Sequence, residues 1–203
     1  MEILTFPVTP FFTNCYVVKD GDEAIVIDPG EATPELKKSV AECKVAMIFN
    51  THCHCDHSGG NAEMASLTGA PLVCHEADLP LLQALPEQGR MFGVPFPPSP
   101  MPERFVKHGD AVEVGSIHFE VRHTPGHSPG HVVLVADGVA IVGDVLFAGS
   151  IGRPDLPGGS MAQLINSIRT QLLPLPDETQ VLSGHGPATT IGEERMMNPF
   201  LVS

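Results

Sequence analysis

The segment THCHCDH at residues 51–57 constrains this chain more than any other part of its sequence. It follows a short apolar run, VAMIF, which we expect to be a buried strand, and it precedes a Gly-Gly pair where we expect a helix to begin. In extended backbone His52 and His54 point to the same side, and the turn after them can bring Asp56 and His57 to the same cavity. Such metal-binding side chains are costly to bury together unless a cation compensates them. The segment therefore predicts a metal site at a strand–loop–helix junction.

Three later positions carry further side chains that can bind metal. His127 lies in the turn TPGHSPG, Asp144 follows an apolar run as Gly143-Asp144, and His185 lies in GHGP. Each stands at the end of an apolar strand or in a Gly/Pro turn, where a loop can present a ligand on a rigid sheet. These positions favour a metal site over the alternative, a chance cluster of surface histidines.

The order His-x-His-x-Asp-His, then His, Asp and His, resembles the pattern of the metallo-β-lactamase superfamily over nearly the whole chain. Within that superfamily, the segments QGRMFG (88–93), GRPDLPGG (152–159) and NPFL (198–201) resemble the glyoxalase II group, the hydroxyacylglutathione hydrolases. They are most similar to its short bacterial members of the YcbL type. The resemblance implies an α+β fold, a four-layer αβ/βα sandwich with a metal site at one edge of its two sheets. It also implies one domain over residues 1–203, without the C-terminal helical domain that grips glutathione in longer relatives.

The resemblance further implies two divalent metal ions, with zinc favoured and iron or manganese also compatible with such nitrogen and oxygen ligands. The first metal would be held by His52, His54 and His127. The second would be held by Asp56, His57 and His185. Asp144 would bridge both metals, and Asp56 and Asp144 are the expected catalytic residues.

The expected activity is hydrolysis of thioesters, with S-lactoylglutathione or a similar hydroxyacyl thioester as substrate. Two metals that share a water lower its pKa, so that hydroxide bridging them can attack the substrate carbonyl at neutral pH. A thiolate leaves without a strong general acid. The chain also lacks the Gly-x-Ser-x-Gly motif of serine hydrolases.

Other functions are compatible with the same residues. A mononuclear iron persulfide dioxygenase acting on glutathione persulfide would use His54 or a neighbouring histidine, with His127 and Asp144. A fold that binds metal and a ligand without turnover is a third hypothesis. Hydrolysis of lactones or phosphodiesters stays open, and a β-lactam substrate is less favoured.

Few basic side chains are available to bind a substrate carboxylate. Arg90, Arg153 and Lys107 are the candidates, although an ion pair with Asp155 is an equally good interpretation of Arg153.

Four residues near the predicted ligands have alternative interpretations. Cys53 and Cys55 could provide a thiolate ligand or a redox switch, but packing beside the site is favoured for both. His131 is a candidate to hold a ligand in place. Asp28 is another, unless it only forms the Asp-Pro-Gly turn that follows its strand.

The composition narrows the partners and the location. Lys and Arg number 11 against 24 Asp and Glu, a net charge of −13, which disfavours binding to duplex nucleic acid. The five cysteines follow no regular spacing, so we expect reduced thiols rather than a disulfide framework. No signal peptide and no apolar run of about 18 residues is found. We expect a cytoplasmic protein with a small-molecule substrate and without nucleic-acid or membrane partners; its oligomeric state is left open.

The rest of the chain predicts short elements. Strands are expected at 17–18, 24–27, 117–121, 132–135, 139–142 and 181–182. One helix should begin after Thr33, a second after Gly60 with Met64 and Leu67 buried, and a third after Ser160.

Residues 86–102 contain six prolines and predict a loop, with Met91, Phe92 and Phe96 exposed unless they pack against another part of the chain. A solvated crossover is favoured over a rim or lid above a pocket.

Overall fold

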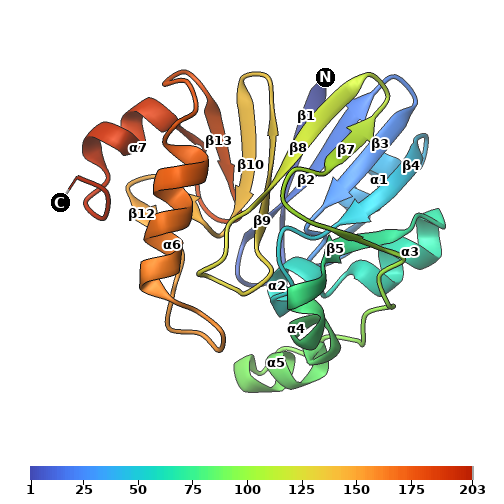
Figure 1. The fold of residues 1–203 in the computed structure, drawn as a ribbon. Helices are drawn as coiled ribbons and strands as arrows, with labels where there is room; N and C mark the ends of the chain where they lie inside the picture. Colours follow the sequence, from blue (N-terminus) through green and yellow to red (C-terminus); the bar gives the residue numbers. More distant parts are fainter. Residues whose placement is uncertain (203) are drawn as a thin grey trace.

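The computed structural model describes residues 1–202 and contains two six-stranded sheets that face each other, with helices outside both (Figure 1). The first sheet has the order β1 (Glu2–Val8), β2 (Thr13–Asp20), β3 (Glu23–Ile27), β4 (Lys44–Phe49), β5 (Leu72–His75), β6 (Arg104–Val106). The second has the order β14 (Thr189–Thr190), β13 (Gln180–Ser183), β10 (Val139–Gly143), β9 (Val132–Ala136), β8 (Ile117–His123), β7 (Ala111–Val114). A small ribbon pairs β11 (Leu146–Phe147) with β12 (Ser150–Ile151).

The helices fall into three groups (Figure 1). Outside the first sheet lie α1 (Pro34–Val40) and α3 (Asn61–Thr68). Outside the second sheet lie α6 (Met161–Ser167), its π-helical continuation η2 (Ile168–Leu172), and α7 (Ile191–Met197). At one edge of the sandwich lie α2 (Cys55–Ser58), the short turn η1 (Glu76–Asp78), α4 (Leu79–Gln83) and α5 (Leu85–Phe92). No helix in residues 1–202 is long and apolar enough to cross a membrane.

Three apolar clusters separate the four layers. Within β3, Ile25 and Ile27 point between the sheets, where they pack in the cluster that contains Phe119 of β8. Val26 points to the opposite face and packs in the cluster that contains Leu36 of α1. A third cluster joins the outer face of the second sheet to α6 and η2. Because strands buried on both faces expose no side to water, they appear as continuous apolar runs in the sequence. The α+β sandwich implied by the resemblance is confirmed.

Most of the expected elements form, since local sequence signals agree with the packing. Thr33 caps α1, and its Oγ1 accepts a hydrogen bond from the Leu36 N–H at 3.2 Å. Ser160 caps α6 in the same way, accepting from the N–H of Gln163. The helix after Gly60 buries Met64 but leaves Leu67 51 % exposed, so the expected burial of Leu67 is wrong. This helix has only two turns, and the sheet covers the face that carries Asn61 and Met64.

The loop predicted for residues 86–102 is wrong in its first part, because α5 occupies Leu85–Phe92. Pro86 lies in the first turn of the helix, where a missing N–H costs nothing. Gly93 ends the helix at a φ of +71°, a backbone conformation that favours glycine. Met91 and Phe92 are exposed as expected, whereas Phe96 is only partly exposed and packs against the core under α3 and α4.

The loops that follow the central strands meet at one edge of the sandwich, close to α2 (Figure 1). β3 and β4 run parallel, and so do β10 and β13. Their carboxyl ends therefore lead to Asp28, to residues 50–57, to Asp144 and to His185. This topology alone gathers segments that are far apart in the chain.

Candidate metal centre

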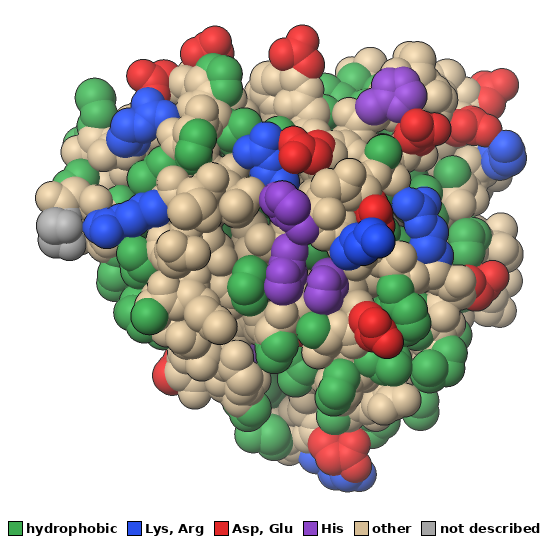
Figure 2. Space-filling view, viewed as in Figure 1, with side chains coloured by type: hydrophobic (Ala, Val, Ile, Leu, Met, Phe, Trp, Pro, Cys, Tyr) green, Lys and Arg blue, Asp and Glu red, His purple; other side chains and the backbone are tan. Residues whose placement is uncertain are grey.

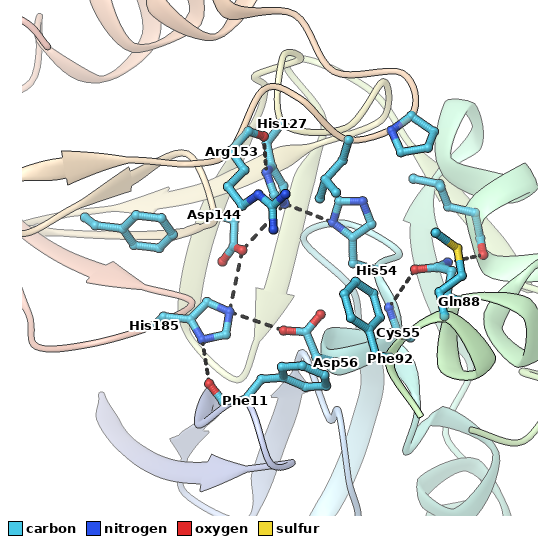
Figure 3. Close-up of a pocket in the computed structure, with 15 residues that line it drawn as sticks. Phe11, His54, Cys55, Asp56, Gln88, Phe92, His127, Asp144, Arg153 and His185 are labelled. Carbon is cyan, nitrogen blue, oxygen red and sulfur yellow. Dashed lines mark hydrogen bonds and ion pairs between the residues drawn. The ribbon is translucent and has the colours of Figure 1, made fainter. Parts of the chain in front are cut away.

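The predicted ligands converge beside a cavity of about 450 Å³ (Figure 3). Five of the predicted ligands line the cavity: His54, Asp56, His127, Asp144 and His185. His52 and His57 are buried just behind them. Asp56 lies in the first turn of α2, where a negative charge is favoured, as the sequence predicted.

One cluster consists of His52, His54 and His127, each offering a ring nitrogen within 4.8 Å of the other two. The closest pair is His54 Nδ1 and His127 Nε2, which are 2.9 Å apart. The imidazoles of His52 and His54 meet edge to face at 4.8 Å between ring centroids.

A second cluster consists of Asp56, His57 and His185, also within 4.8 Å of one another. Asp56 Oδ2 lies 3.4 Å from His57 Nε2 and 3.2 Å from His185 Nε2. Asp144 lies between the two clusters: its Oδ2 is 3.5 Å from His127 Nε2, and its Oδ1 is 3.4 Å from His57 Nε2. Asp144 is therefore placed to reach both clusters.

These atoms fit a bound metal. Around a tetrahedral metal with ligand distances of about 2.0–2.2 Å, neighbouring ligand atoms are about 3.3–3.6 Å apart, close to the spacings observed here. Three atoms at the centre, His52 Nε2, His57 Nε2 and Asp144 Oδ1, are buried without any hydrogen-bond partner. Buried polar atoms are rarely left unpaired, so the convergence of these three atoms fits the binding of a cation.

Each histidine of the second cluster, and His127, has its other ring nitrogen held by the protein. Asp28 Oδ2 binds Nδ1 of His57 at 3.0 Å, and the backbone oxygen of Phe11 binds Nδ1 of His185 at 3.1 Å. The backbone oxygen of Arg153 binds Nδ1 of His127 at 2.8 Å. This arrangement directs Nε2 of each ring to the centre, as is typical of histidines that ligate metals.

Burial lowers the pKa of two histidines of the first cluster, His52 and His54. It lowers the pKa of His52 well below its usual value. Burial, reinforced by the neighbouring His127, also lowers the pKa of His54 to about 3. Neutral imidazole is the form that binds metal, so these rings are ready to do so at neutral pH.

The carboxylates of Asp56 and Asp144 favour a positive charge between them, at His57 of the second cluster. Burial opposes protonation of His57, but Asp56 and Asp144 together raise its pKa well above the usual value. Burial would raise the pKa of Asp56, yet the adjacent His57 lowers it to about 2. A divalent cation would supply the positive charge that these carboxylates favour.

Glycine allows the close approach at the centre. A Cβ at Gly184 would collide with Asp144 Oδ1 and with the ring of His57. The GHGP motif thus brings the backbone before His185 directly against the site, which no larger residue could do.

The structure places the two other residues that the sequence suggested as supports. Asp28 is buried and accepts hydrogen bonds from Thr51, at both N–H and Oγ1, in addition to binding His57. His131 is buried, stacks on His52, and accepts from the backbone N–H of Asp144 at 3.1 Å. Asp28 thus contacts the side chain of the predicted ligand His57. His131 contacts the side chain of His52 and the backbone of Asp144.

Sequence reasoning missed three residues that hold the ligand loops. The buried Asp78 accepts hydrogen bonds from the N–H of Cys53, the Ser128 hydroxyl and the N–H of Gly130, and so ties the loop of His54 to that of His127. Burial raises the pKa of Asp78 despite these bonds. Thr13 Oγ1 donates to Asp56 Oδ2 at 2.9 Å.

Gln88 of α5 is the third missed residue. It accepts from the N–H of Cys55 at 3.0 Å and donates to the carbonyl oxygens of Cys53 and Leu81. The sequence gives no sign of this role, because each of these contacts spans a tertiary interface or a loop.

The candidate substrate residues are placed unequally. Arg153 lines the cavity and forms the expected ion pair with Asp155, with two contacts at 3.0 and 2.9 Å. Arg90 is exposed, pairs with Glu87, and does not line the cavity, because it faces solvent on α5. The structure therefore does not bring Arg90 to the site. Lys107 is also exposed and outside the cavity lining.

The two cysteines of the motif differ. Cys53 is fully buried in the apolar core, which supports the packing interpretation. Cys55 packs against the same core but also lines the cavity.

Comparisons with known proteins agree with this geometry. The family model of the metallo-β-lactamase superfamily matches residues 8–185. Hydroxyacylglutathione hydrolase GloC of Haemophilus influenzae is 40% identical over 210 residues, covering 100% of this chain and 99% of that protein. The structure of the BLEG-1 B3 metallo-β-lactamase is similar with a TM-score of 0.92 and 36% identity over 100% of both chains. That of TTHA1623 in a di-iron-bound form has a TM-score of 0.89 and 38% identity over 98% of this chain and 100% of its own. The chain belongs to the metallo-β-lactamase superfamily.

Proposed function

We propose that this chain is a metal-dependent hydrolase of thioesters, with S-lactoylglutathione as the reference substrate. The observation that carries the proposal is Asp144, which reaches both ligand clusters at the floor of a cavity open to small molecules. In this proposal the ligands of two metals, zinc ahead of iron or manganese, are His52, His54 and His127 for one, Asp56, His57 and His185 for the other, and Asp144 for both.

Bound there, divalent metals lower the pKa of a water and polarise a carbonyl oxygen. Side chains of the protein orient the carboxylates and accept the proton. Thr13 orients the carboxylate of Asp56, and Asp56 and Asp144 offer carboxylate oxygens that can accept the proton which the attacking water loses. The new C–O bond replaces the C–S bond, so the products are a carboxylic acid and a thiol. No serine, threonine or lysine lines the cavity in residues 1–202.

Two relatives support different parts of this proposal. The name of GloC supports hydrolysis of hydroxyacyl thioesters of glutathione, and the di-iron form of TTHA1623 supports a site for two metals. A mononuclear persulfide dioxygenase would need one metal, whereas Asp56, His57 and His185 form a candidate metal-binding group beside that of His52, His54 and His127. The name of BLEG-1 makes β-lactam hydrolysis the second reaction to assay.

The first test is elemental analysis of protein purified without added metal, followed by assays of free-thiol release from S-lactoylglutathione. We expect about two metal equivalents per chain and thiol release that a chelator stops. A single equivalent of iron with oxygen uptake on glutathione persulfide would replace the proposal by the dioxygenase. Turnover of a chromogenic cephalosporin, without thioester hydrolysis, would replace it by a β-lactamase.

A further inference from the structure

The walls of the cavity differ in chemistry from its floor. Above the ligands, most of the lining is apolar and is formed by the side chains of Phe11, Leu81, Met91, Phe92, Phe147 and Leu156. Figure 2 shows hydrophobic side chains predominating over α4 and α5, at the bottom of that view. A cavity of this size with apolar walls and a polar floor is typical of a small-molecule site.

Two aromatic rings meet at the mouth from opposite sides. Phe11 lies in the turn between β1 and β2, and Phe92 lies at the end of α5. Their rings pack edge to face, with centroids 5.6 Å apart (Figure 3). Met91 is 77 % exposed and Phe92 50 % exposed, and both side chains also line the cavity. Exposed apolar side chains that lie together often mark a binding site.

The polar side chains of the walls are already engaged by the protein. The amide of Gln88 uses its oxygen on Cys55 and its nitrogen on two backbone carbonyls. The guanidinium of Arg153, the single Lys or Arg side chain in the lining within residues 1–202, is held by both oxygens of Asp155. A substrate hydroxyl or carboxylate therefore finds few unpaired partners above the floor.

The charge of the thiol carrier also affects which thioester the cavity binds. Glutathione carries carboxylates at both ends of the tripeptide, and the chain has a net charge of −13. Binding such a carrier needs cations near the mouth, where Arg153 is 65 % exposed and already paired. An uncharged carrier meets no such difficulty.

We propose that the site selects thioesters with an apolar acyl group on an uncharged carrier, in preference to hydroxyacyl thioesters of glutathione, through contact with Met91 and Phe92. This inference rests on the proposed thioesterase function and assigns it a preferred substrate class other than that of the reference substrate, S-lactoylglutathione. Hydrolysis consumes one water, breaks the C–S bond, and releases a carboxylic acid and an uncharged thiol.

The test compares acyl groups on one carrier and carriers for one acyl group. Acetyl, butanoyl, hexanoyl and lactoyl thioesters of N-acetylcysteamine are assayed beside hexanoyl- and lactoylglutathione. Each methylene that the walls bury should raise kcat/KM about fourfold, so that hexanoyl exceeds lactoyl at least about tenfold. Moving the hexanoyl group to glutathione should lower kcat/KM. A preference for lactoyl over hexanoyl, or an equal or higher kcat/KM for hexanoylglutathione, would overturn the inference.

A matched pair of double variants locates the effect. Met91 and Phe92 end α5, while Met196 and Met197 end α7, are 74 % and 75 % exposed, and lie outside the cavity lining. Met91→Gln with Phe92→Gln should lower kcat/KM for the hexanoyl thioester at least about tenfold, and by a larger factor than for the acetyl thioester, which buries fewer methylenes. Met196→Gln with Met197→Gln should change neither. Equal loss for both acyl groups, or for both variants, would contradict the assignment.

A binding measurement keeps this inference separate from the proposed function. Calorimetric titration uses thioethers that cannot be hydrolysed: S-methyl- and S-hexyl-N-acetylcysteamine and S-hexylglutathione. S-hexyl-N-acetylcysteamine should bind at least about tenfold tighter than the S-methyl compound. The affinity for the hexyl compound should fall in the Met91/Phe92 double variant. If these results hold while no thioester is turned over, the proposed function fails and the apolar site stands. If thioesters are hydrolysed but the methyl and hexyl compounds bind alike, only the inference fails.

Discussion

At the floor of the cavity the predicted ligands are buried or, for Asp56 and His185, only partly exposed, whereas Met91 and Phe92 on the wall formed by α5 are exposed to solvent. Asp28 and Asp78 together accept hydrogen bonds from several loops at the floor, and both carboxylates are almost fully buried. On the wall, Met91 and Phe92 project from a helix whose polar link to the floor is Gln88. Buried, satisfied networks are rigid, and exposed apolar side chains adapt to what they bind.

The comparison teaches that reaction and selection are built separately in this molecule. The floor determines which chemistry can occur, because metal-ligand geometry must be held to a fraction of an ångström. The wall contributes contact area and tolerates change. Substitutions in the floor should therefore cost activity and metal, and substitutions in the wall should change preference.

The largest effect is expected at Asp144, the residue that joins both clusters. Asp144→Ala should lower kcat for thioester hydrolysis by about a thousandfold and reduce the bound metal to about one equivalent or less. The reason is that His57 and His127 lose the carboxylate that lies 3.4–3.5 Å from each of them. Steady-state kinetics and elemental analysis provide the measurement.

The control for Asp144 is Asp155→Ala, which removes an exposed carboxylate paired with Arg153. Metal content and kcat should stay within about twofold of the parent. Wild-type activity in Asp144→Ala would show that the two clusters do not work as one site.

An intermediate effect is expected at Asp78, which belongs to the floor but touches no predicted ligand side chain. Asp78→Asn places an N–H₂ group against N–H or O–H donors, namely those of Cys53, Ser128 and Gly130. One unsatisfied buried donor costs about 2 kcal/mol, which corresponds to a Tm lower by about 4–8 °C for a chain of this size. Calorimetry of the metal-free and metal-loaded variant and parent protein measures this change in Tm.

Metal affinity should fall about tenfold or more in the same variant, because the loops of His54 and His127 are no longer tied together. Asp155→Asn, the same change at an exposed position, should leave the Tm and the affinity unaltered. An unchanged Tm in Asp78→Asn would mean that the floor is not held by this carboxylate.

The smallest effect is expected where wall and floor meet. Gln88→Ala frees the N–H of Cys55 and the carbonyl oxygen of Cys53, and the loss of about 1 kcal/mol corresponds to about a fivefold lower kcat/KM. Gln88→Glu should recover part of it, since it keeps the acceptor for Cys55. Gln83→Ala on the neighbouring α4 is exposed and serves as the matched control. A loss in kcat as large as that of Asp144→Ala would place Gln88 in the floor rather than at its margin.

That the expected ligand side chains gather at one sheet edge could be predicted from local signals. A histidine or aspartate shortly after an apolar strand emerges at the end of that strand, as His52, Asp144 and His185 do. The central strands and the caps at Thr33 and Ser160 were predicted for the same reason. Short edge strands such as β6 and β14 were not, since they lack an apolar run and depend on their partners.

The Pro-rich segment shows the limit of local signals. Prolines predict a loop when counted together, yet Pro86 at a first helical turn is compatible with a helix. The segment is placed as a helix by the contact of α5 with the loop of Cys53 and Cys55 through Gln88. The local sequence does not reveal this contact. The lid interpretation, less favoured from the sequence, is the one that the cavity lining supports.

By itself the sequence determined the family, the types of metal-binding side chain and the order in which they occur, because these depend on residue identity and on the strand that each residue follows. Only the tertiary structure decided which side chains brace them and what surrounds them. Asp78 meets its partners across 25 to 52 residues of chain, and Phe11 meets Phe92 across the mouth of the cavity. Such contacts arise when distant segments pack at one sheet edge, and no local pattern records them.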